Sequence, residues 1–499
     1  MKITLNKGSY DSAPKEYVRT VLTDDAKDHQ KFLKENGIET LLLGTGLPAG
    51  KAGKSEEMNL RQFRLLCRRI VNVAKKNKIK KIAIQFDRTP SLFKNLHGIS
   101  PEKISEVAAE SFLMAGYEHI SFKTKPKEGW GGVEELRAYS HVGRTTSNIE
   151  AGVRRGQEIG RAVNACRELA NTPAGHMTPS VLAAAAKKAV KGLPVKVTVL
   201  GEAQMKKLGM GAILGVAKGS SEKPTFTIMS YSPSTGSTSS PQAKARGNKN
   251  NGRPIVLIGK GVTFDSGGLN LKPSSSIYEM HLDMSGAAAV IHAVALAARL
   301  KVKRSVIGIF PAVENMPGNE AYRPGDVLTS LSGKTIEVLD TDAEGRLILA
   351  DAITYAKRFK PAVVVDVATL TGAALGALGQ HANAFLTRDE KLAKQVEESA
   401  ERSGDYSWRL PLWDEYEERV RGTFADLKNV PGGSTSRYGG AIDGAMFLWQ
   451  FAKELECPWA HIDMAPRMTS VKGDELAEGA CGEPVRLLFD LIENYAVHD

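Results

Sequence analysis

The chain has 499 residues, of which 42% are hydrophobic and 25% are charged, and its formal net charge is +11. These proportions are those of a soluble globular protein. A chain of this length exceeds one ordinary hydrophobic core, so we expect two or more domains.

Secretion and membrane insertion are disfavoured by the sequence. The segment from Met1 to Tyr10 lacks the apolar stretch of a secretory signal, and the apolar run from Ala287 to Ala298 is too short to span a membrane. The cysteines show no paired spacing, which excludes a disulfide framework and predicts free thiols in a reducing cytoplasm. They are Cys67, Cys166, Cys457 and Cys481.

The first part of the chain, up to about Tyr139, alternates apolar strands with helical patterns. The expected strands include Thr40 to Leu43, Ile82 to Ile84 and His119 to Phe122. This alternation predicts a small α/β domain over residues 1–148. A helix over residues 149–170 is expected to link it to a larger domain over residues 171–499.

Positive charge is concentrated in the first domain. Residues 1–150 contain 26 lysines and arginines against 18 acidic residues, which accounts for +8 of the net charge. Apolar residues recur at helical spacing from Leu60 to Ala74, among Arg64, Arg68, Arg69, Lys75 and Lys76. A basic amphipathic helix is therefore predicted. Its basic face is either solvated or in contact with DNA or another anionic surface.

Apolar strands and helices continue through the second domain. The expected strands are Lys196–Leu200, Thr225–Ser230, Ile255–Ile258, Ser305–Phe310 and Ala362–Val367. Helical segments between most of them predict an α/β fold with a central mixed sheet covered by helices on both faces. The stretch from Ser232 to Arg253 is of low complexity and predicts a surface insertion.

Two carboxylates and a guanidinium lie close together between Asp340 and Leu347, just after the apolar run Ile336–Leu339. If this segment stays extended, Asp342 and Glu344 point to the same side. Two adjacent carboxylates repel unless a cation neutralises them, so a divalent metal is one explanation. A solvated acidic turn is the other.

A second polar cluster follows the expected strand Ile255–Ile258. A glycine-rich loop there contains Lys260, Asp265 and Lys272, and Asp283 precedes the apolar helix that begins near Ala287. Four carboxylates suit Mg, Mn or Zn, and about two divalent ions would balance their charge. Lys260 is either a ligand whose amine a nearby dication keeps neutral, or the partner of Asp265 in a salt bridge.

These motifs resemble those of the leucyl aminopeptidase family, which includes cytosol aminopeptidase and bacterial aminopeptidase A. The family octapeptide is N-T-D-A-E-G-R-L, and the chain differs from it only in having Asp340 at the usual asparagine. The resemblance runs in order from about Ile149 to the C-terminus. Further matching segments are Asn171–Pro173, Gly259–Pro273, Glu314–Pro317, Arg323–Thr329 and Asp366–Ala373.

The resemblance implies two divalent metal ions per subunit, Mn or Zn, and assigns ligands to each. One ion would be held by Lys260, Asp265, Asp283 and Glu344. The other would be held by Asp265, Asp342 and Glu344, so Asp265 and Glu344 would bridge the two ions. Lys260 would then be a ligand rather than a salt-bridge partner.

The resemblance also implies a reaction, the release of N-terminal amino acids from peptides by a water activated between the metals. Lys272 would polarise the scissile carbonyl as an ammonium. Arg346, with the backbone at Leu370, would hold a bicarbonate that acts as general base.

Five residues map onto the family's side-chain pocket and imply a preference for leucine and other apolar N-terminal residues. They are Met280, Thr369, Gly372, Ala465 and Met468. Methionine adapts to several apolar shapes, although both methionines are alternatively ordinary core residues. The resemblance further implies a homohexamer active in cytoplasmic peptide turnover. His281 and His292 are expected to be structural or to contact the metal ligands without binding metal, and Asp340 adds a negative charge near the metals.

Two other functions remain as hypotheses. A nucleic-acid-binding regulator would act through the basic first domain, alone or together with peptidase activity. Another two-metal hydrolase, such as a phosphatase, would use Lys272 and Arg346 on phosphate. The ordered family motifs favour the aminopeptidase.

Overall fold

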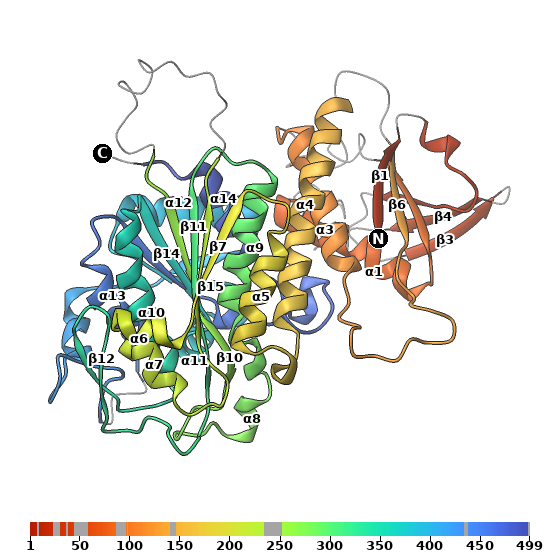
Figure 1. The fold of residues 1–499 in the computed structure, drawn as a ribbon. Coiled ribbons are helices and arrows are strands. Elements are labelled where there is room, and N and C mark those ends of the chain that lie inside the picture. Colours follow the sequence, from red (N-terminus) through yellow and green to blue (C-terminus); the bar gives the residue numbers. More distant parts are fainter. Residues whose placement is uncertain are drawn as a thin grey trace, which may run out of the picture. The chain divides into compact units, whose positions relative to one another are not determined.

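The computed structural model describes residues 1–6, 9–22, 30–35, 38–43, 58–85, 96, 98–139, 146–233, 252–433 and 438–497. These residues form two compact units (Figure 1). Unit 1 comprises residues within 1–164 and 470–478, and unit 2 comprises residues within 165–469 and 479–497. The division falls inside one continuous helix, α4 (Thr146–Ala170). The low-complexity insertion expected at 232–253 lies mostly outside the described residues.

Unit 1 is built on a mixed sheet with the strand order β1-β6-β5-β2-β4-β3. Its strands are β1 (Lys2–Asn6), β2 (Val18–Leu22), β3 (Gln30–Glu35), β4 (Ile38–Leu43), β5 (Lys81–Gln85) and β6 (Glu135–Tyr139). Neighbouring strands are parallel except β3 and β4, which are antiparallel. Strands β4 and β5 include the segments expected at Thr40–Leu43 and Ile82–Ile84.

The predicted basic helix is present as α1 (Leu60–Lys76), which lies beside α3 (Pro101–Gly116). A capping box starts α1, because the Asn59 side chain accepts from the Gln62 amide at 3.0 Å and the Gln62 side chain accepts from the Asn59 amide at 2.8 Å. Its apolar face packs into the core of unit 1.

Several cations of α1 point into unit 1 rather than into solvent. Arg64 and Arg68 are only 3% and 6% exposed. Arg64 pairs with Glu110 of α3 at 3.5 Å, and Nη1 of Arg68 donates to the carbonyl of Asp474 at 2.9 Å. The predicted basic face is therefore smaller than the charge count suggests. DNA contact through this helix stays a prediction.

The strand expected at His119–Phe122 is wrong. The chain leaves α3 at Gly116 and runs through an irregular segment and a turn. Phe122 is 54% exposed, so the alternating pattern buries no apolar face there. An alternating apolar and polar pattern of four residues does not form a strand where no neighbouring strand pairs with it.

Unit 2 is built on a mixed sheet with the strand order β16-β15-β18-β14-β9-β11-β8-β7, and β10 also pairs with β11. Strands β18, β14, β9, β11 and β10 are parallel to their neighbours in this central part. The strands are β7 (Val195–Leu200), β8 (Thr225–Tyr231), β9 (Ile255–Gly259), β10 (Gly261–Asp265), β11 (Val306–Asn315), β14 (Val363–Ala368), β15 (Asn383–Leu386), β16 (Ser407–Arg409) and β18 (Trp459–Asp463). The five strands expected in this part of the chain are all present.

Helices cover both faces of this sheet, as predicted (Figure 1). One face carries α5 (Pro179–Ala189), α9 (Ser285–Arg299), α12 (Glu390–Ser403) and α14 (Val485–Asn494). The other carries α7 (Gly211–Ala217), α10 (Glu344–Ala356) and α13 (Gly440–Ala452). Shorter helices are α6 (Glu202–Leu208), α8 (Ser274–Ile277) and α11 (Gly372–Leu378).

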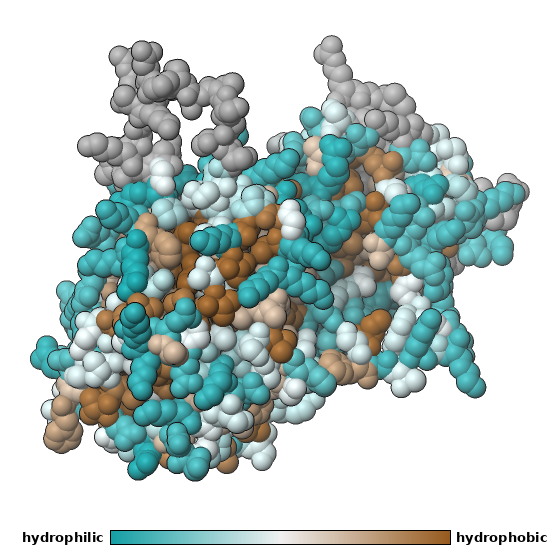
Figure 2. Space-filling model, viewed as in Figure 1, coloured by the Kyte–Doolittle hydropathy of each residue, from teal (hydrophilic) through white to brown (hydrophobic). Residues whose placement is uncertain are grey.

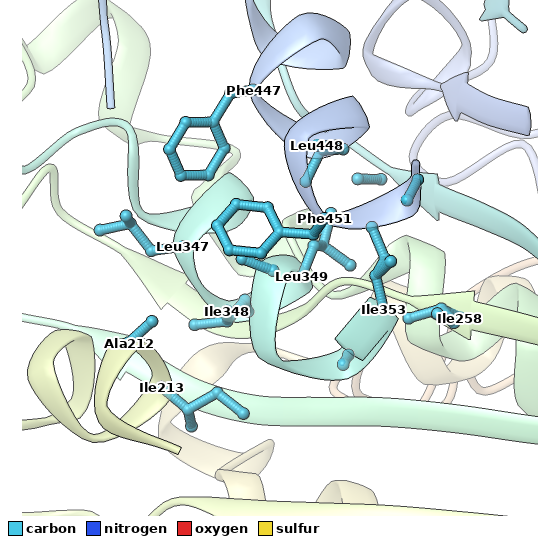
Figure 3. Packing of buried hydrophobic residues seen from close by; sticks show 14 of the residues in the cluster. Ala212, Ile213, Ile258, Leu347, Ile348, Leu349, Ile353, Phe447, Leu448 and Phe451 are labelled. Atoms are coloured by element: carbon cyan, nitrogen blue, oxygen red, sulfur yellow. The ribbon is translucent and has the colours of Figure 1, made fainter. Parts of the chain in front are cut away.

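The core beneath α10 and α13 fixes the start of α10. Figure 3 shows Leu347, Ile348 and Ile353 of α10 among Phe447 and Phe451 of α13. All five side chains are at most 1% exposed. Burial of such a side chain stabilises the fold by about 1.5–3 kcal/mol. The helix that begins at Glu344 is therefore held by apolar packing only three residues further along the chain.

The apolar run Ile336–Leu339 forms a shorter strand than expected, β13 (Thr335–Glu337). It pairs with β12 (Val327–Thr329) and β17 (Leu427–Lys428) in a small separate sheet. Ile336 and Val338 are buried, but Leu339 is 37% exposed. The run therefore ends at the surface instead of extending the central sheet.

One helical segment, Met280–Arg299, is long and apolar enough to cross a membrane by length and composition, yet 83% of its apolar window is buried inside the protein. It includes α9, which packs on the central sheet. Figure 2 shows a mostly hydrophilic surface on the face in view, with hydrophobic areas between.

Candidate metal centre

The polar residues singled out from the sequence gather at the carboxyl ends of the parallel strands of unit 2. Lys260 follows β9, Asp265 ends β10 and Thr369 follows β14, while Asp463, to which the sequence assigned no role, ends β18. Parallel strands place these ends at one edge of the sheet, where α/β proteins bind ligands. The segment from Gly259 to Asp265, expected as a loop, is mostly strand β10.

The segment from Asp342 to Glu344 is not extended, so the condition under which both side chains would point to the same side is not met. Asp342 lies in a turn, and Glu344 is the first residue of α10. The two carboxylates nevertheless meet, because the turn brings them to Asp265. Carboxylate oxygens of Asp265, Asp342 and Glu344 all lie within 4.8 Å of one another. The solvated acidic turn is thereby excluded, since Glu344 is only 1% exposed.

Two lysines cross-link this cluster. The Nζ atom of Lys260 lies 2.8 Å from Oδ2 of Asp283 and 2.7 Å from Oε1 of Glu344. The Nζ atom of Lys272 lies 2.9 Å from Oδ2 of Asp265 and also pairs with Asp342. Asp265 therefore pairs with Lys272, and not with Lys260 as the salt-bridge alternative supposed.

The electrostatics of the cluster call for additional positive charge. Burial raises the pKa of Asp283 well above its usual range, although Lys260 opposes the shift. Burial and the carboxylates of Asp265 and Glu344 raise the pKa of Asp342 to about 7. Burial lowers the pKa of Lys260, but the surrounding carboxylates outweigh that effect and raise it. A dication relieves the repulsion that causes the acidic shifts.

The donor atoms also fit a metal. Three buried oxygens accept no hydrogen bond with suitable geometry from the described residues, and only the lysine ammoniums lie against them. These oxygens are Oδ2 of Asp283, Oδ1 of Asp342 and Oε1 of Glu344. Carboxylate oxygens in a buried, convergent set are the ligands that Mg, Mn and Zn accept.

Asn315 and Thr341, to which the sequence assigned no role, hold the carboxylate cluster in place through hydrogen bonds. Nδ2 of Asn315 donates to Oδ1 of Asp265 at 2.8 Å and to the carbonyl of Thr341 at 3.0 Å. Oγ1 of Thr341 donates to the carbonyl of Gly267 at 2.7 Å. These side chains join the β10 loop to the turn before α10. Asn315 and Thr341 lie inside the matching family segments, which was the available signal.

Arg346 lies beside the cluster in the first turn of α10 and is 6% exposed. Its Nη1 donates to the carbonyl of Asn429 at 2.6 Å, whereas its buried Nε has no partner among the described residues. A Cβ built on Gly444 would lie 3.5 Å from Nη2. An unsatisfied edge of a planar guanidinium fits a planar oxyanion such as bicarbonate.

Leu370, expected to complete the anion site through its backbone, already uses its amide. That N–H donates to Oδ1 of Asp463 at 3.0 Å. The side chain of Leu370 is nevertheless close to Arg346, because the Cβ position of Gly444 lies 3.1 Å from its Cδ2 atom as well. Asp463 is a further residue without a role in the sequence analysis.

Hydrogen bonds link two of the five expected pocket residues, Thr369 and Ala465, to aspartates of the site. Oγ1 of Thr369 donates to Oδ1 of Asp283 at 2.6 Å. Asp283 lies three residues after Met280 in the chain. Oδ1 of Asp463 accepts from the amide of Ala465 at 3.1 Å. Gly372 opens α11, which packs against the 3₁₀ helix Ala465–Arg467 next to Met468.

The burial of the pocket residues differs from that of a core. Met280 and Met468 are half-buried and Gly372 is exposed, so neither methionine is an ordinary core residue. Of the two nearby histidines, His292 lies within α9, where burial lowers the pKa of its imidazole to about 4. A neutral histidine inside a core helix is consistent with a structural role.

Buried carboxylates that converge with lysines at the carboxyl ends of parallel strands are typical of metal-dependent enzymes. The model of the cytosol aminopeptidase family, catalytic domain, matches residues 164–489. A probable cytosol aminopeptidase of Syntrophotalea carbinolica is 38% identical over 475 residues, which cover 93% of this chain and 90% of that protein. One of Azoarcus sp. is 46% identical over 349 residues, 70% of this chain and 65% of that protein.

A solved structure is similar to this chain over nearly its whole length. It is the bottromycin maturation enzyme BotP in complex with Mn, which is 29% identical to this chain and superposes with a TM-score of 0.80. The match covers 96% of this chain and 98% of the BotP chain. The chain belongs to the cytosol aminopeptidase family. It is accordingly a metallopeptidase that acts as an aminopeptidase.

Proposed function

We propose that the protein releases N-terminal leucine and other apolar residues from peptides, with two divalent metal ions and a bicarbonate in the site described above. The observation that carries this proposal is the convergence of Asp265, Asp342 and Glu344 within 4.8 Å, with Lys260 and Lys272 against them.

Each metal ion has a ligand set in this proposal. Lys260, Asp265, Asp283 and Glu344 would hold one ion, and Asp265, Asp342 and Glu344 would hold the other. When bound, two divalent ions lower the pKa of the water between them and neutralise the charge that develops on the scissile carbonyl. Mn or Zn would serve, because both accept carboxylate and nitrogen ligands.

Two cationic side chains take part in the proposed reaction. Lys272 acts on the substrate, and Arg346 binds the bicarbonate. Lys272 is held near the cluster by Asp265 and Asp342, whose carboxylates outweigh burial and raise its pKa, so it remains an ammonium at neutral pH. It stabilises the oxyanion that forms at the scissile carbonyl. Arg346, whose Nε has no partner among the described residues, would hold bicarbonate, and bicarbonate would supply the general base.

The specificity belongs to the half-buried pocket. Met280 and Met468 adapt to leucine and similar side chains, while Thr369, Gly372 and Ala465 complete the wall. We further propose a homohexamer in the cytoplasm that turns over short peptides. A nucleic-acid function gains no support from α1, because Arg64 and Arg68 are buried in unit 1.

Hydrolysis of leucine p-nitroanilide by the purified protein tests the proposal. The assay is run with added Mn, after chelation, with and without bicarbonate, and with an N-acetylated substrate. Lys272→Ala is compared with Lys223→Ala, since Lys223 also pairs with a carboxylate but is 79% exposed.

The expected result is metal-dependent release that fails on the acetylated substrate, falls at least about 100-fold in Lys272→Ala and is unchanged in Lys223→Ala. A comparison of leucine with lysine and glutamate substrates measures the preference. Release that does not need metal, or that proceeds equally without Lys272, contradicts the proposed mechanism.

A further inference from the structure

Asn429 lies outside the short matching segments named in the sequence, yet it bonds both to the turn before Asp342 and to the side chain of Arg346. It follows β17 (Leu427–Lys428) and is fully buried. Its backbone N–H donates to the carbonyl of Glu337 at 3.0 Å, which extends the pairing of β17 with β13. The small sheet thereby fixes the position of Asn429 beside the turn that leads to Asp342.

The side chain of Asn429 holds that turn. Its Oδ1 accepts from the amide of Leu339 at 2.8 Å, and its Nδ2 donates to the carbonyl of Asp340 at 2.6 Å. The Asp340 side chain in turn accepts from the amide of Asp342 at 2.8 Å. A carboxamide is needed here, because one end must accept and the other must donate.

The backbone of Asn429 holds the guanidinium. Its carbonyl accepts from Nη1 of Arg346 at 2.6 Å, and this bond fixes the plane of the guanidinium with Nε left unsatisfied. One buried residue therefore determines how the turn that carries Asp342 and the side chain of Arg346 are placed relative to each other.

We propose that Asn429 is a positioning residue for the aminopeptidase reaction, which aligns the metal-binding turn at Asp342 with the anion-binding guanidinium of Arg346. This inference rests on the proposed function, which gives those two residues their roles. Reacting groups that act together lose rate steeply when their relative position shifts by as little as about 1 Å.

A purely structural role predicts a different outcome, and the chain provides a matched control. Asn383 in β15 is also fully buried, and its Nδ2 donates to the carbonyl of Tyr406 and to Oε2 of Glu483, both at 3.2 Å. The same substitution at Asn383 disturbs a buried carboxamide of equal size whose bonds go elsewhere. If Asn429 only stabilises the fold, both positions respond alike.

The experiment compares Asn429→Asp and Asn429→Ser with Asn383→Asp and Asn383→Ser in the full-length protein. Aspartate keeps the shape and the acceptor for Leu339, but it loses the donor to Asp340. Each variant is assayed for kcat and KM on leucine p-nitroanilide across a bicarbonate series. Mn binding is measured separately by calorimetry, and Tm by circular dichroism.

For both Asn429 variants we expect kcat to fall about 10- to 100-fold while KM changes less than about threefold. The bicarbonate concentration for half-maximal activity rises about tenfold, and Mn affinity falls about tenfold. The Asn383 variants lower Tm but retain the wild-type kcat, bicarbonate response and Mn affinity.

Asn429 variants that lose only Tm, to the same extent as the Asn383 variants, overturn the inference. So does a failure of both Asn429 variants to fold when the Asn383 variants fold, because Asn429 would then serve the fold. The proposed function fails separately, if the wild-type protein needs neither metal nor bicarbonate. In that case the Mn affinity of the Asn429 variants still decides whether the turn is positioned by this residue.

Discussion

The Nζ atom of Lys260 lies 2.7 Å from Oε1 of Glu344, in an ion pair whose side chains are only 4% and 1% exposed. Buried ion pairs are not evidence of stability, because desolvation offsets most of the attraction. Both residues are proposed metal ligands, so the pair brings two members of the proposed ligand set into contact.

Metal affinity is expected to increase with pH. The carboxylates around Lys260 outweigh burial and raise the pKa of its amine, so it carries a proton that a metal must displace. Affinity for the ion that uses Lys260 should then rise by up to about tenfold per pH unit. Calorimetry with Mn at about pH 6.5 and about pH 8.5 measures this slope, and Lys260→Met should reduce it to the part that comes from the carboxylates, whose pKa values are also raised. A pH-independent affinity in the wild-type protein contradicts the assignment of Lys260 as a ligand.

Gly345 is expected to be required for the metal site but not for the fold. A Cβ at this position would lie 2.6 Å from Cε and 2.7 Å from Nζ of Lys260. Gly345→Ala therefore displaces the amine, although alanine favours a helix such as α10 by about 1 kcal/mol. We expect an unchanged or higher Tm in the metal-free variant and at least about tenfold weaker Mn binding.

The matched control for Gly345→Ala is Gly376→Ala in α11, where a Cβ would meet no atom within 4 Å. That variant should bind Mn as the wild-type protein does. Tight Mn binding by Gly345→Ala would mean that the amine of Lys260 moves freely or is not a ligand.

Asp340→Asn restores the family octapeptide and is expected to weaken metal binding slightly. Asparagine can still accept from the amide of Asp342 through Oδ1, as Asp340 does at 2.8 Å, so the turn is preserved. The change removes one negative charge from a half-buried position, worth about 0.5–1 kcal/mol, or roughly threefold in affinity. Mn titrations at low and high ionic strength should show the difference shrinking with salt. Tighter binding in the variant would contradict this electrostatic account.

Asp351 is expected to make stability fall as the pH rises. Its carboxylate accepts from the amides of Ala212, Ile213 and Leu331 at 3.1, 3.0 and 2.7 Å. Burial nevertheless raises its pKa to about 7, against these bonds. The folded protein thus keeps a proton that the unfolded chain releases near pH 4, and the resulting stability is lost between about pH 4 and about pH 7.

Asp351→Asn should remove that part of the pH dependence and lower stability by about 1–3 kcal/mol, because the amide has one acceptor atom fewer. Urea unfolding of metal-free protein at about pH 5 and about pH 8 measures both effects. Asp426→Asn is the control. The Thr335 amide lowers the pKa of this exposed carboxylate, so its contribution to stability grows as the pH rises, opposite to that of Asp351. A wild-type protein more stable at the higher pH, with Asp351→Asn showing the same difference, would contradict the assignment.

The sequence by itself predicted the elements whose pattern is local. Apolar residues at helical spacing from Leu60 to Ala74 became α1, and the apolar runs at Ile255 and Ala362 became β9 and β14. The octapeptide at Asp340–Leu347 supplied the carboxylates and the arginine of the site. Such patterns are readable because periodicity and residue type are properties of neighbouring positions.

Only the tertiary structure decided how distant segments meet. It paired Lys260 with Glu344 and Lys272 with Asp265, placed Asp342 in a turn before α10 and left His119–Phe122 without a neighbouring strand. It also brought Asn429 to Arg346 across 83 positions of the chain. These relationships depend on which surfaces pack together, and no local pattern in the sequence specifies that choice.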